Sequence, residues 1–130
     1  MGLERKVLLP GIVDVKQLLQ RTDVLVVPSR IDGRPNAVLE ALAMGLPVIA
    51  SDIGGLPHII QSGDCGYLCP VGDVGAIARH IEELHADRAL RESLGRNARA
   101  YAFEHLDARV MLKKYLTIFS QLLGRGRGKG

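Results

Sequence analysis

Unbroken apolar runs at four places along the chain predict short β-strands. Residues 6–9 form a run that ends at Pro10 and Gly11, which predicts a strand followed by a turn. Residues 24–27 and 47–51 are rich in aliphatic and β-branched side chains, as is typical of parallel strands buried on both faces. A fourth short strand is predicted over residues 66–69.

Apolar residues at helical spacing occupy the segments between and after these strands. Helices are expected over residues 14–22, 37–44, 74–85, 88–104 and 107–123, with a short helical turn over residues 56–61. The positions that set the apolar faces are Val15, Leu18, Leu19, Ile77, Ile81, Leu84, Leu90, Leu94, Ala98, Tyr101, Val110, Leu112, Tyr115, Leu116, Phe119, Leu122 and Leu123. Asn36 is expected to cap the second helix, and Gly45 to take the left-handed position after its end.

The alternation of strands and helices predicts the fold class. It implies βαβ crossovers, and therefore an α/β domain with a Rossmann-like parallel sheet, flanking helices and a helical C-terminus. In such sheets ligands bind beside the carboxyl ends of the strands. The loops after residues 27 and 51 both lie at such ends, so we expect them to line one crevice.

Length and composition bound the class of protein. The chain has 130 residues, 47% hydrophobic and 24% charged, as expected for one globular domain with a single core. We expect this domain to span residues 1–123 and residues 124–130 to form a basic, disordered Gly/Arg tail. The net charge is +3, and without the tail it is near zero, which argues against a nucleic-acid-binding surface on the domain. Contact of the tail with RNA or an acidic membrane surface is the alternative interpretation.

Two further features bear on compartment and metal binding. Cys65 and Cys69 are too few for a disulfide framework and lack the partners of a metal site, so we expect two small apolar residues beside a strand and no metal. No apolar run approaches a membrane span, and the N-terminus shows no signal-peptide pattern. The expected compartment is the cytoplasm. His80 and His85 are expected on solvated helix surfaces.

The segment from Pro28 to Glu40 carries the candidate chemistry. It predicts a strand end, a loop with Gly33, and a helix start, whose unpaired N–H groups suit a phosphate or diphosphate. Asp32 and Glu40 bracket this helix start, and a carboxylate suits the two donors of a sugar or ribose diol. From the residues alone, an ordinary turn acid is the favoured interpretation of Asp32, and Glu40 is equally well explained as an acid favoured by the helix dipole.

The run over residues 28–51 resembles the signature of the group 1 glycosyl transferases, glycosyltransferase family 4, which has two acids separated by seven residues. Residues 52–57 (DIGGLP), 66–70 (GYLCP) and 72–73 (GD) resemble the family's next motifs, and the resemblance covers about residues 7–103. It implies that the chain is part of the C-terminal, donor-binding half of a GT-B fold, incomplete at its N-terminal side.

The resemblance also implies a role for each matching residue. Asp32 and Glu40 match the two acids assigned to catalysis, with Asp32 holding hydroxyls of the transferred sugar and Glu40 the ribose. The residues that match the donor-binding positions are Gly11, near the base, and Gly33, Arg34, Pro35, Asn36, Ala37 and Val38, near the sugar and the diphosphate. The family retains the anomeric configuration, usually needs no metal in this site, and uses the nucleotide-sugar as substrate rather than a cofactor.

Three departures from the family pattern concern the site. Asp32 stands where the first acid is usually Glu, which shortens the side chain by one methylene. His58 stands where Glu is common. The family's diphosphate-binding basic residues and its acceptor domain lie upstream of the matched segment.

The sequence therefore predicts transfer of a hexosyl group from a UDP- or GDP-sugar to an acceptor that it does not identify. The expected partners are the nucleotide-sugar and an N-terminal acceptor-binding domain, with peripheral association at the inner face of a membrane through a lipid or glycan acceptor. Two alternatives stay open: a nucleotide-sugar-binding module that is inactive alone, and an unrelated Rossmann-like nucleotide-binding or interaction domain.

Overall fold

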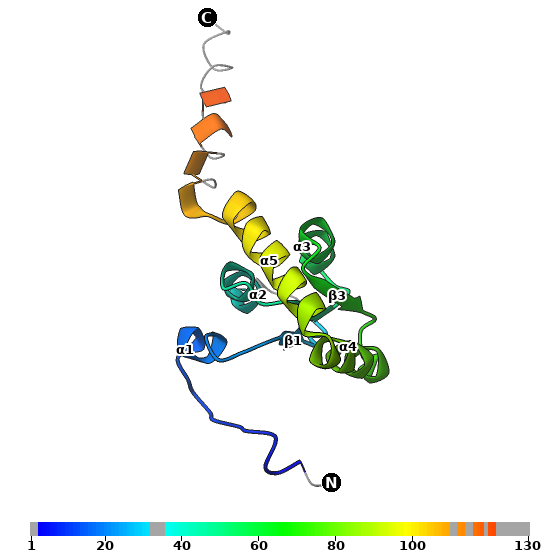
Figure 1. The fold of residues 1–130 in the computed structure, drawn as a ribbon. Coiled ribbons are helices and arrows are strands. Elements are labelled where there is room, and N and C mark those ends of the chain that lie inside the picture. Colours follow the sequence, from blue (N-terminus) through cyan, green and yellow to red (C-terminus); the bar gives the residue numbers. More distant parts are fainter. Residues whose placement is uncertain (1–2, 32–35, 110–111, 114–115, 119, 122–130) are drawn as a thin grey trace, which may run out of the picture.

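The computed structural model describes residues 3–31, 36–109, 112–113, 116–118 and 120–121 (Figure 1). Three strands and five helices follow one another along the described residues. They are α1 (Val15–Leu19), β1 (Leu25–Val27), α2 (Asn36–Ala43), β2 (Val48–Ser51), α3 (Leu56–Gly63), β3 (Gly66–Cys69), α4 (Val74–Ala86) and α5 (Arg88–His105).

The three strands form one parallel sheet in the order β1-β2-β3. Val27 pairs with Ala50, and Ser51 pairs with Cys69, so the strands end at nearly the same level. Every residue of β2 is buried, as the sequence predicts for a strand covered on both faces. The same prediction is wrong for β1, whose three residues are only partly buried because β1 is an edge strand of this sheet.

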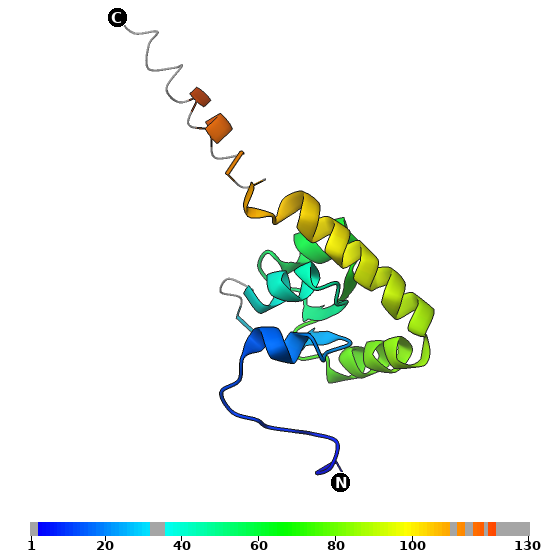
Figure 2. The ribbon, with the colours of Figure 1, turned by 60° about the vertical axis from the view of Figure 1, so that its left-hand side comes forward.

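The strand predicted over residues 6–9 is also wrong for this structure. These residues belong to no strand, and Leu8 and Leu9 are 82% and 92% exposed. Figures 1 and 2 show the segment running away from the sheet in an extended path. A β-strand exists only when a neighbour satisfies its N–H and C=O groups, and none of the described strands lies beside this segment.

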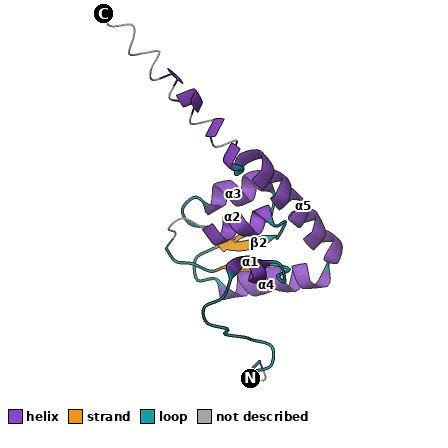
Figure 3. Cartoon of the chain, turned by 90° about the vertical axis from the view of Figure 1, so that its left-hand side faces the viewer, coloured by secondary structure: helices purple, strands orange, loops and turns teal. Residues whose placement is uncertain are grey.

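Helices cover both faces of the sheet (Figure 3). On one face, Val38 and Leu42 of α2 and Leu56 and Ile60 of α3 pack against Val48 and Ala50, together with Ala98 and Ala102 of α5. On the other face, Ala76 and Leu84 of α4 pack against Ile49 and Cys69, together with Leu94 of α5. Helix α5 therefore contributes to the core on both sides, and the described residues confirm the predicted three-layer α/β architecture.

Most helix boundaries agree with the sequence to within one or two residues. Helix α2 begins at Asn36 itself, so the prediction that Asn36 precedes the helix as its cap is wrong by one position. Gly45 follows α2 with φ +76°, which confirms the left-handed residue expected there. Helix α3 extends to Gly63 and is longer than the predicted turn, whereas α1 is shorter than predicted and buries only Leu19.

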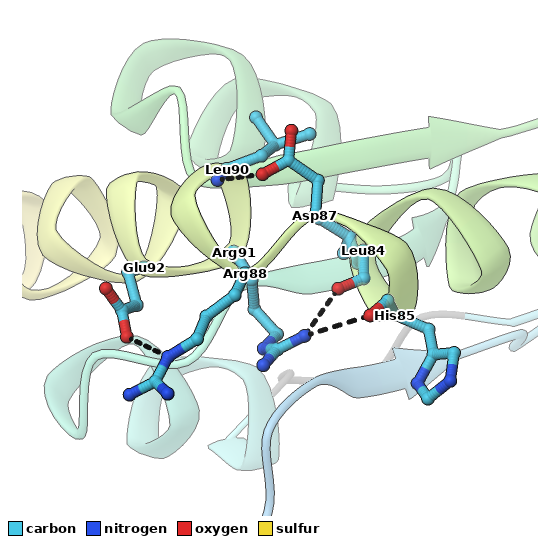
Figure 4. A network of polar contacts seen from close by, with 7 residues as sticks. All are labelled: Leu84, His85, Asp87, Arg88, Leu90, Arg91 and Glu92. Carbon is cyan, nitrogen blue, oxygen red and sulfur yellow. Dashed lines mark hydrogen bonds and ion pairs between the residues drawn. The ribbon is translucent and has the colours of Figure 1, made fainter.

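The turn between α4 and α5 is fixed by polar contacts (Figure 4). Asp87 caps α5 by accepting a hydrogen bond from Leu90 N at 2.9 Å. Arg91 Nη1 donates to Leu84 O at 2.7 Å and so ties α5 to the last turn of α4. At the outer surface, Arg88 Nε donates to Glu92 Oε1 at 2.7 Å.

Beyond α5, the described residues 108–109, 112–113, 116–118 and 120–121 are helical. Leu112, Leu116 and Ile118 are all more than half exposed there. The other apolar positions of the predicted last helix, Val110, Tyr115, Phe119, Leu122 and Leu123, lie outside the described residues.

Two side-chain predictions on α4 are wrong. His80 is partly buried rather than solvated: its ring stacks on Tyr67 with centroids 4.0 Å apart, and Nδ1 lies 3.3 Å from Glu83 Oε2. Ile81 is exposed, and Ala76 takes the buried position instead. Exposed His85 agrees with the sequence. Cys65 and Cys69 are buried in the packing clusters of opposite faces, as expected for small apolar residues.

Candidate functional site

The start of α2 lies at the carboxyl end of the sheet, directly after β1 and its loop. Asn36 and Ala37, the first two residues of α2, are exposed, whereas the Val38 side chain is 1% exposed and belongs to the core. Val38 can therefore offer a ligand only its backbone. Asp32, Gly33, Arg34 and Pro35 lie outside the described residues, so the structure leaves their predicted roles untested.

A second helix start lies at the same edge, after β2. Gly54 has φ +56°, and Gly55 is the N-cap of α3, where no side chain caps the helix. Because β1 and β2 are adjacent and parallel, both helix starts follow neighbouring strand ends. Both are on the same face of the sheet, since α2 and α3 pack in the same cluster. Two partial positive charges at one edge favour an anionic ligand there.

Glu40 lies in the second turn of α2 and is exposed. The stabilisation of acids by the helix dipole falls off within the first turn, so it explains Glu40 poorly. Within the described part of the chain, no side-chain hydrogen bond or ion pair within 4 Å involves its carboxylate. Glu40 instead lines a mainly apolar groove of about 340 Å³ between α2 and the end of α5, with Leu39, Ala43, Ala102, Phe103, Leu106 and Asp107. The carboxylate is thus free to bind a ligand.

Gly11 lies in the extended N-terminal segment. It has φ +72° and is exposed, and a Cβ placed on it would meet no atom within 4 Å. The segment leads into α1, which Asp14 caps and which packs against α2, with Leu19 in the core. Gly11 thus lies in the segment that leads into α1, on the side of the molecule that carries α2.

Three residues at this edge were not singled out from the sequence. Arg30 and Ile31 follow β1 and are both exposed, with Ile31 at 87%. Ser51 ends β2 and is buried, and its Oγ lacks a hydrogen-bond partner among the described residues. The signals that could have identified them are a cation and an apolar residue next to the first acid, and a hydroxyl at the end of an apolar strand.

The described residues contain no cluster of three His, Cys, Asp or Glu side chains suited to a metal ion. None of the helices in the described ranges is both long and apolar enough to cross a membrane.

A parallel sheet with helices on both faces and two helix starts at its carboxyl edge defines the chain as an α/β domain of the Rossmann-like class. Comparison with known families identifies the family to which this domain belongs. Residues 1–101 match the family model described as "Glycosyl transferases group 1", and the chain belongs to this family. This confirms the resemblance found in the sequence and removes the alternative of an unrelated nucleotide-binding or interaction domain.

Individual relatives align with most of this chain. N-acetyl-alpha-D-glucosaminyl L-malate synthase of Bacillus anthracis is 35% identical over 95% of the chain and 32% of the relative. Among solved structures, sucrose-phosphate synthase of Thermosynechococcus elongatus gives a TM-score of 0.83 at 29% identity, over 95% of this chain and 32% of that one. S. aureus TarM in complex with fondaparinux, alpha-GlcNAc-glycerol and UDP gives 0.81 at 28% identity, over 91% and 24%. The chain therefore spans about a third or less of these proteins.

Proposed function

We propose that this chain is the donor-binding part of a retaining glycosyltransferase, which transfers a hexosyl group from a UDP- or GDP-sugar to an acceptor. The observation that carries the proposal is the exposed start of α2 with the free carboxylate of Glu40 one turn further on, inside the segment that matches the family. The similarity to a TarM structure that contains UDP supports a nucleoside diphosphate as ligand.

The diphosphate is bound by backbone N–H groups of residues 33–38, Pro35 excepted, from the loop after β1 into the start of α2. Asn36 and Ala37 are exposed and suited to this contact. Arg34 and Pro35 belong to the loop before α2, and the start of α3 adds a second partial positive charge at the same edge. Arg30, exposed at the end of β1, is a cation of this chain that can approach the leaving diphosphate.

The two acids bind the sugars on either side of the diphosphate. Asp32 accepts hydrogen bonds from hydroxyls of the transferred hexose, and Glu40 accepts them from the ribose diol. Gly11 lies near the base. Positioning by these contacts stabilises the separating charge as the glycosidic bond to the diphosphate breaks. The leaving phosphate oxygen accepts the acceptor's proton, and the acceptor attacks from the same face, so that the anomeric configuration is retained.

The acceptor is bound by another domain. The chain spans about a third of its relatives, which favours a donor-binding module that is inactive alone. We propose that residues 1–123 form this module, in the cytoplasm, and that a lipid or glycan acceptor brings it to the inner face of a membrane.

Calorimetry with UDP and GDP tests the donor site. We expect weak binding of one of them, and Glu40→Gln to weaken it by about 1–3 kcal/mol because a charge-assisted hydrogen bond is lost. Glu82→Gln, on α4 at the other face of the sheet, is the matched control and should bind like the unchanged chain. Absence of heat with both nucleotides in folded protein would refute the donor-site proposal.

A transfer assay tests the need for another domain. We expect no turnover from this chain with UDP- or GDP-hexoses and simple acceptors, and turnover once the acceptor-binding domain of a relative is fused upstream. NMR of the product should show the anomeric configuration of the donor. Turnover by the chain alone would contradict the incomplete-enzyme proposal, and an inverted product would contradict the retaining mechanism.

A further inference from the structure

The transfer reaction changes the charge of the nucleotide that the candidate site holds. In a nucleotide-sugar each of the two phosphates carries one negative charge. Transfer breaks the bond between the anomeric carbon and the β-phosphate oxygen, and the electron pair stays on that oxygen. The acceptor oxygen forms the new bond to the anomeric carbon, and its proton passes by way of the leaving phosphate to water, because the last pKa of a terminal phosphate is about 6. The product is therefore a nucleoside diphosphate with one more negative charge than the donor.

Two helix starts at the carboxyl edge of the sheet respond to this additional charge. The starts of α2 and α3 follow the adjacent strand ends of β1 and β2, and each presents a partial positive charge there. Neither helix has an acid in its first turn, so no carboxylate of that turn offsets the partial charge. An anion at this edge is stabilised more strongly when its own charge is larger.

Two charged side chains of opposite sign follow the same strand ends. Arg30 lies three residues after β1, Asp52 directly follows β2, and both are exposed. Within the part of the chain that the structure describes, neither forms an ion pair within 4 Å. Arg30 attracts an anion at this edge and Asp52 repels it, so their effects largely cancel and the helix starts determine the balance.

Most contacts of the proposed donor site are made to the nucleotide rather than to the transferred sugar. The start of α2 is assigned to the diphosphate and Glu40 to the ribose, and donor and product share both groups. Only Asp32 and Gly33 are assigned to the sugar. The product therefore keeps the nucleotide contacts after the sugar has left, and it gains the stabilisation of the freed charge.

We propose that this site retains the nucleoside diphosphate product through its freed charge, so that the product inhibits transfer until another reaction consumes it. The inference rests on the donor site proposed above. One unit of charge near a helix start gains about twofold to fivefold in affinity, so two starts give about 4- to 25-fold. Continued transfer then requires either hydrolysis of the product to a nucleoside monophosphate and phosphate, or phosphoryl transfer to it from a nucleoside triphosphate.

Calorimetry with UDP and UDP β-methyl ester, or with the guanosine pair if that base binds, tests the inference. The ester has the charge of the donor but no sugar, so the ratio of the two affinities isolates the effect of the freed charge. We expect UDP to bind about 4- to 25-fold more tightly at about pH 8, where its terminal phosphate is fully ionised. Arg30→Gln should lower this ratio about twofold to fivefold, and Asp52→Asn should raise it by a similar factor.

Two variants away from this edge are the charge-matched controls and should leave the ratio unchanged. Arg21→Gln lies before β1, at the opposite edge of the sheet, and Glu82→Gln lies on α4 at the other face. Equal affinity for UDP and its ester, or a ratio that the controls change as much as Arg30→Gln does, would overturn the inference. Absence of binding by both ligands with either base refutes the donor site itself, so the two failures are distinguishable.

The fused enzyme of the transfer assay tests the need for a consuming reaction. We expect its rate to fall as the nucleoside diphosphate accumulates, and an added nucleoside diphosphatase to keep the rate constant. A progress curve that the diphosphatase does not alter would contradict this part of the inference.

Discussion

Gly66 is the position where a single methyl group should disturb the sheet most. It is the first residue of β3 and pairs with Val48 of the central strand. A Cβ at this position would overlap Val48 O and would lie 2.7 Å from Val48 C and 2.9 Å from Val48 N. All three atoms are backbone of a fully buried strand, so no side chain can move aside to make room.

The size of the effect follows from these contacts. Carbon atoms pack at about 3.5–4.0 Å, so Gly66→Ala must push β3 and β2 apart by about 1 Å at this point. Overpacking of this kind costs about 1–3 kcal/mol. The adjacent hydrogen bond from Val48 N to Cys65 O, 3.1 Å long and buried, is then weakened or lost, which costs about 1–3 kcal/mol more. Removing the flexibility of glycine returns about 1 kcal/mol, so we expect a net loss of about 1–5 kcal/mol.

Urea denaturation followed by circular dichroism measures this loss. With a slope of about 2 kcal/mol/M, the midpoint should fall by at least about 0.5 M. Gly75→Ala is the matched control: its Cβ would meet only Arg79 Nη1 and Asp73 Oδ1, both at 3.5 Å, and alanine favours α4, so stability should rise by up to about 1 kcal/mol. A Gly66→Ala midpoint equal to that of the unchanged chain would refute the close strand contact.

Three further predictions concern caps, the α4–α5 turn and pH. Asp73→Ala removes the cap of α4, whose Oδ1 accepts from Ala76 N at 2.8 Å, and should cost about 1 kcal/mol in urea denaturation. Arg91→Met keeps the aliphatic stem but loses the bond to Leu84 O, and should cost about 1–2 kcal/mol in the same assay. Burial, with a smaller contribution from Asp64, raises the pKa of the Cys65 thiol from 9.0 to about 11. The folded chain then holds this proton where the unfolded chain releases it, so stability should fall between about pH 9 and 11 by about 1–3 kcal/mol, and Cys65→Ala should reduce that fall.

Elements fixed by local sequence were predicted well. The four residues of β3 and both long helices α4 and α5 agree with the expected ranges to within one residue at each end. Helical spacing and flanking residues such as Asp87 and Gly45 determine such elements without reference to the rest of the fold. The edge of the sheet that carries the candidate site was also predictable, because it follows from the alternation of strands and helices along the chain.

Features that depend on distant neighbours were not predictable. Residues 6–9 have the composition of a strand, but composition does not say whether a partner strand lies beside them. The partial burial of β1 follows from its edge position, and the stacking of His80 on Tyr67 from the packing of α4 on β3. The close approach at Gly66 likewise involves its partner Val48 on the neighbouring strand, 18 residues earlier in the sequence.

Helix α5 bears on the candidate donor site. Its buried side, through Ala98 and Ala102, packs against α2 and so supports the helix that carries Glu40. Its exposed end carries Phe103, which lines the same groove as Glu40. The position of the Glu40 carboxylate therefore depends on how α5 packs as well as on the sequence of α2, and this dependence joins residues more than 60 positions apart.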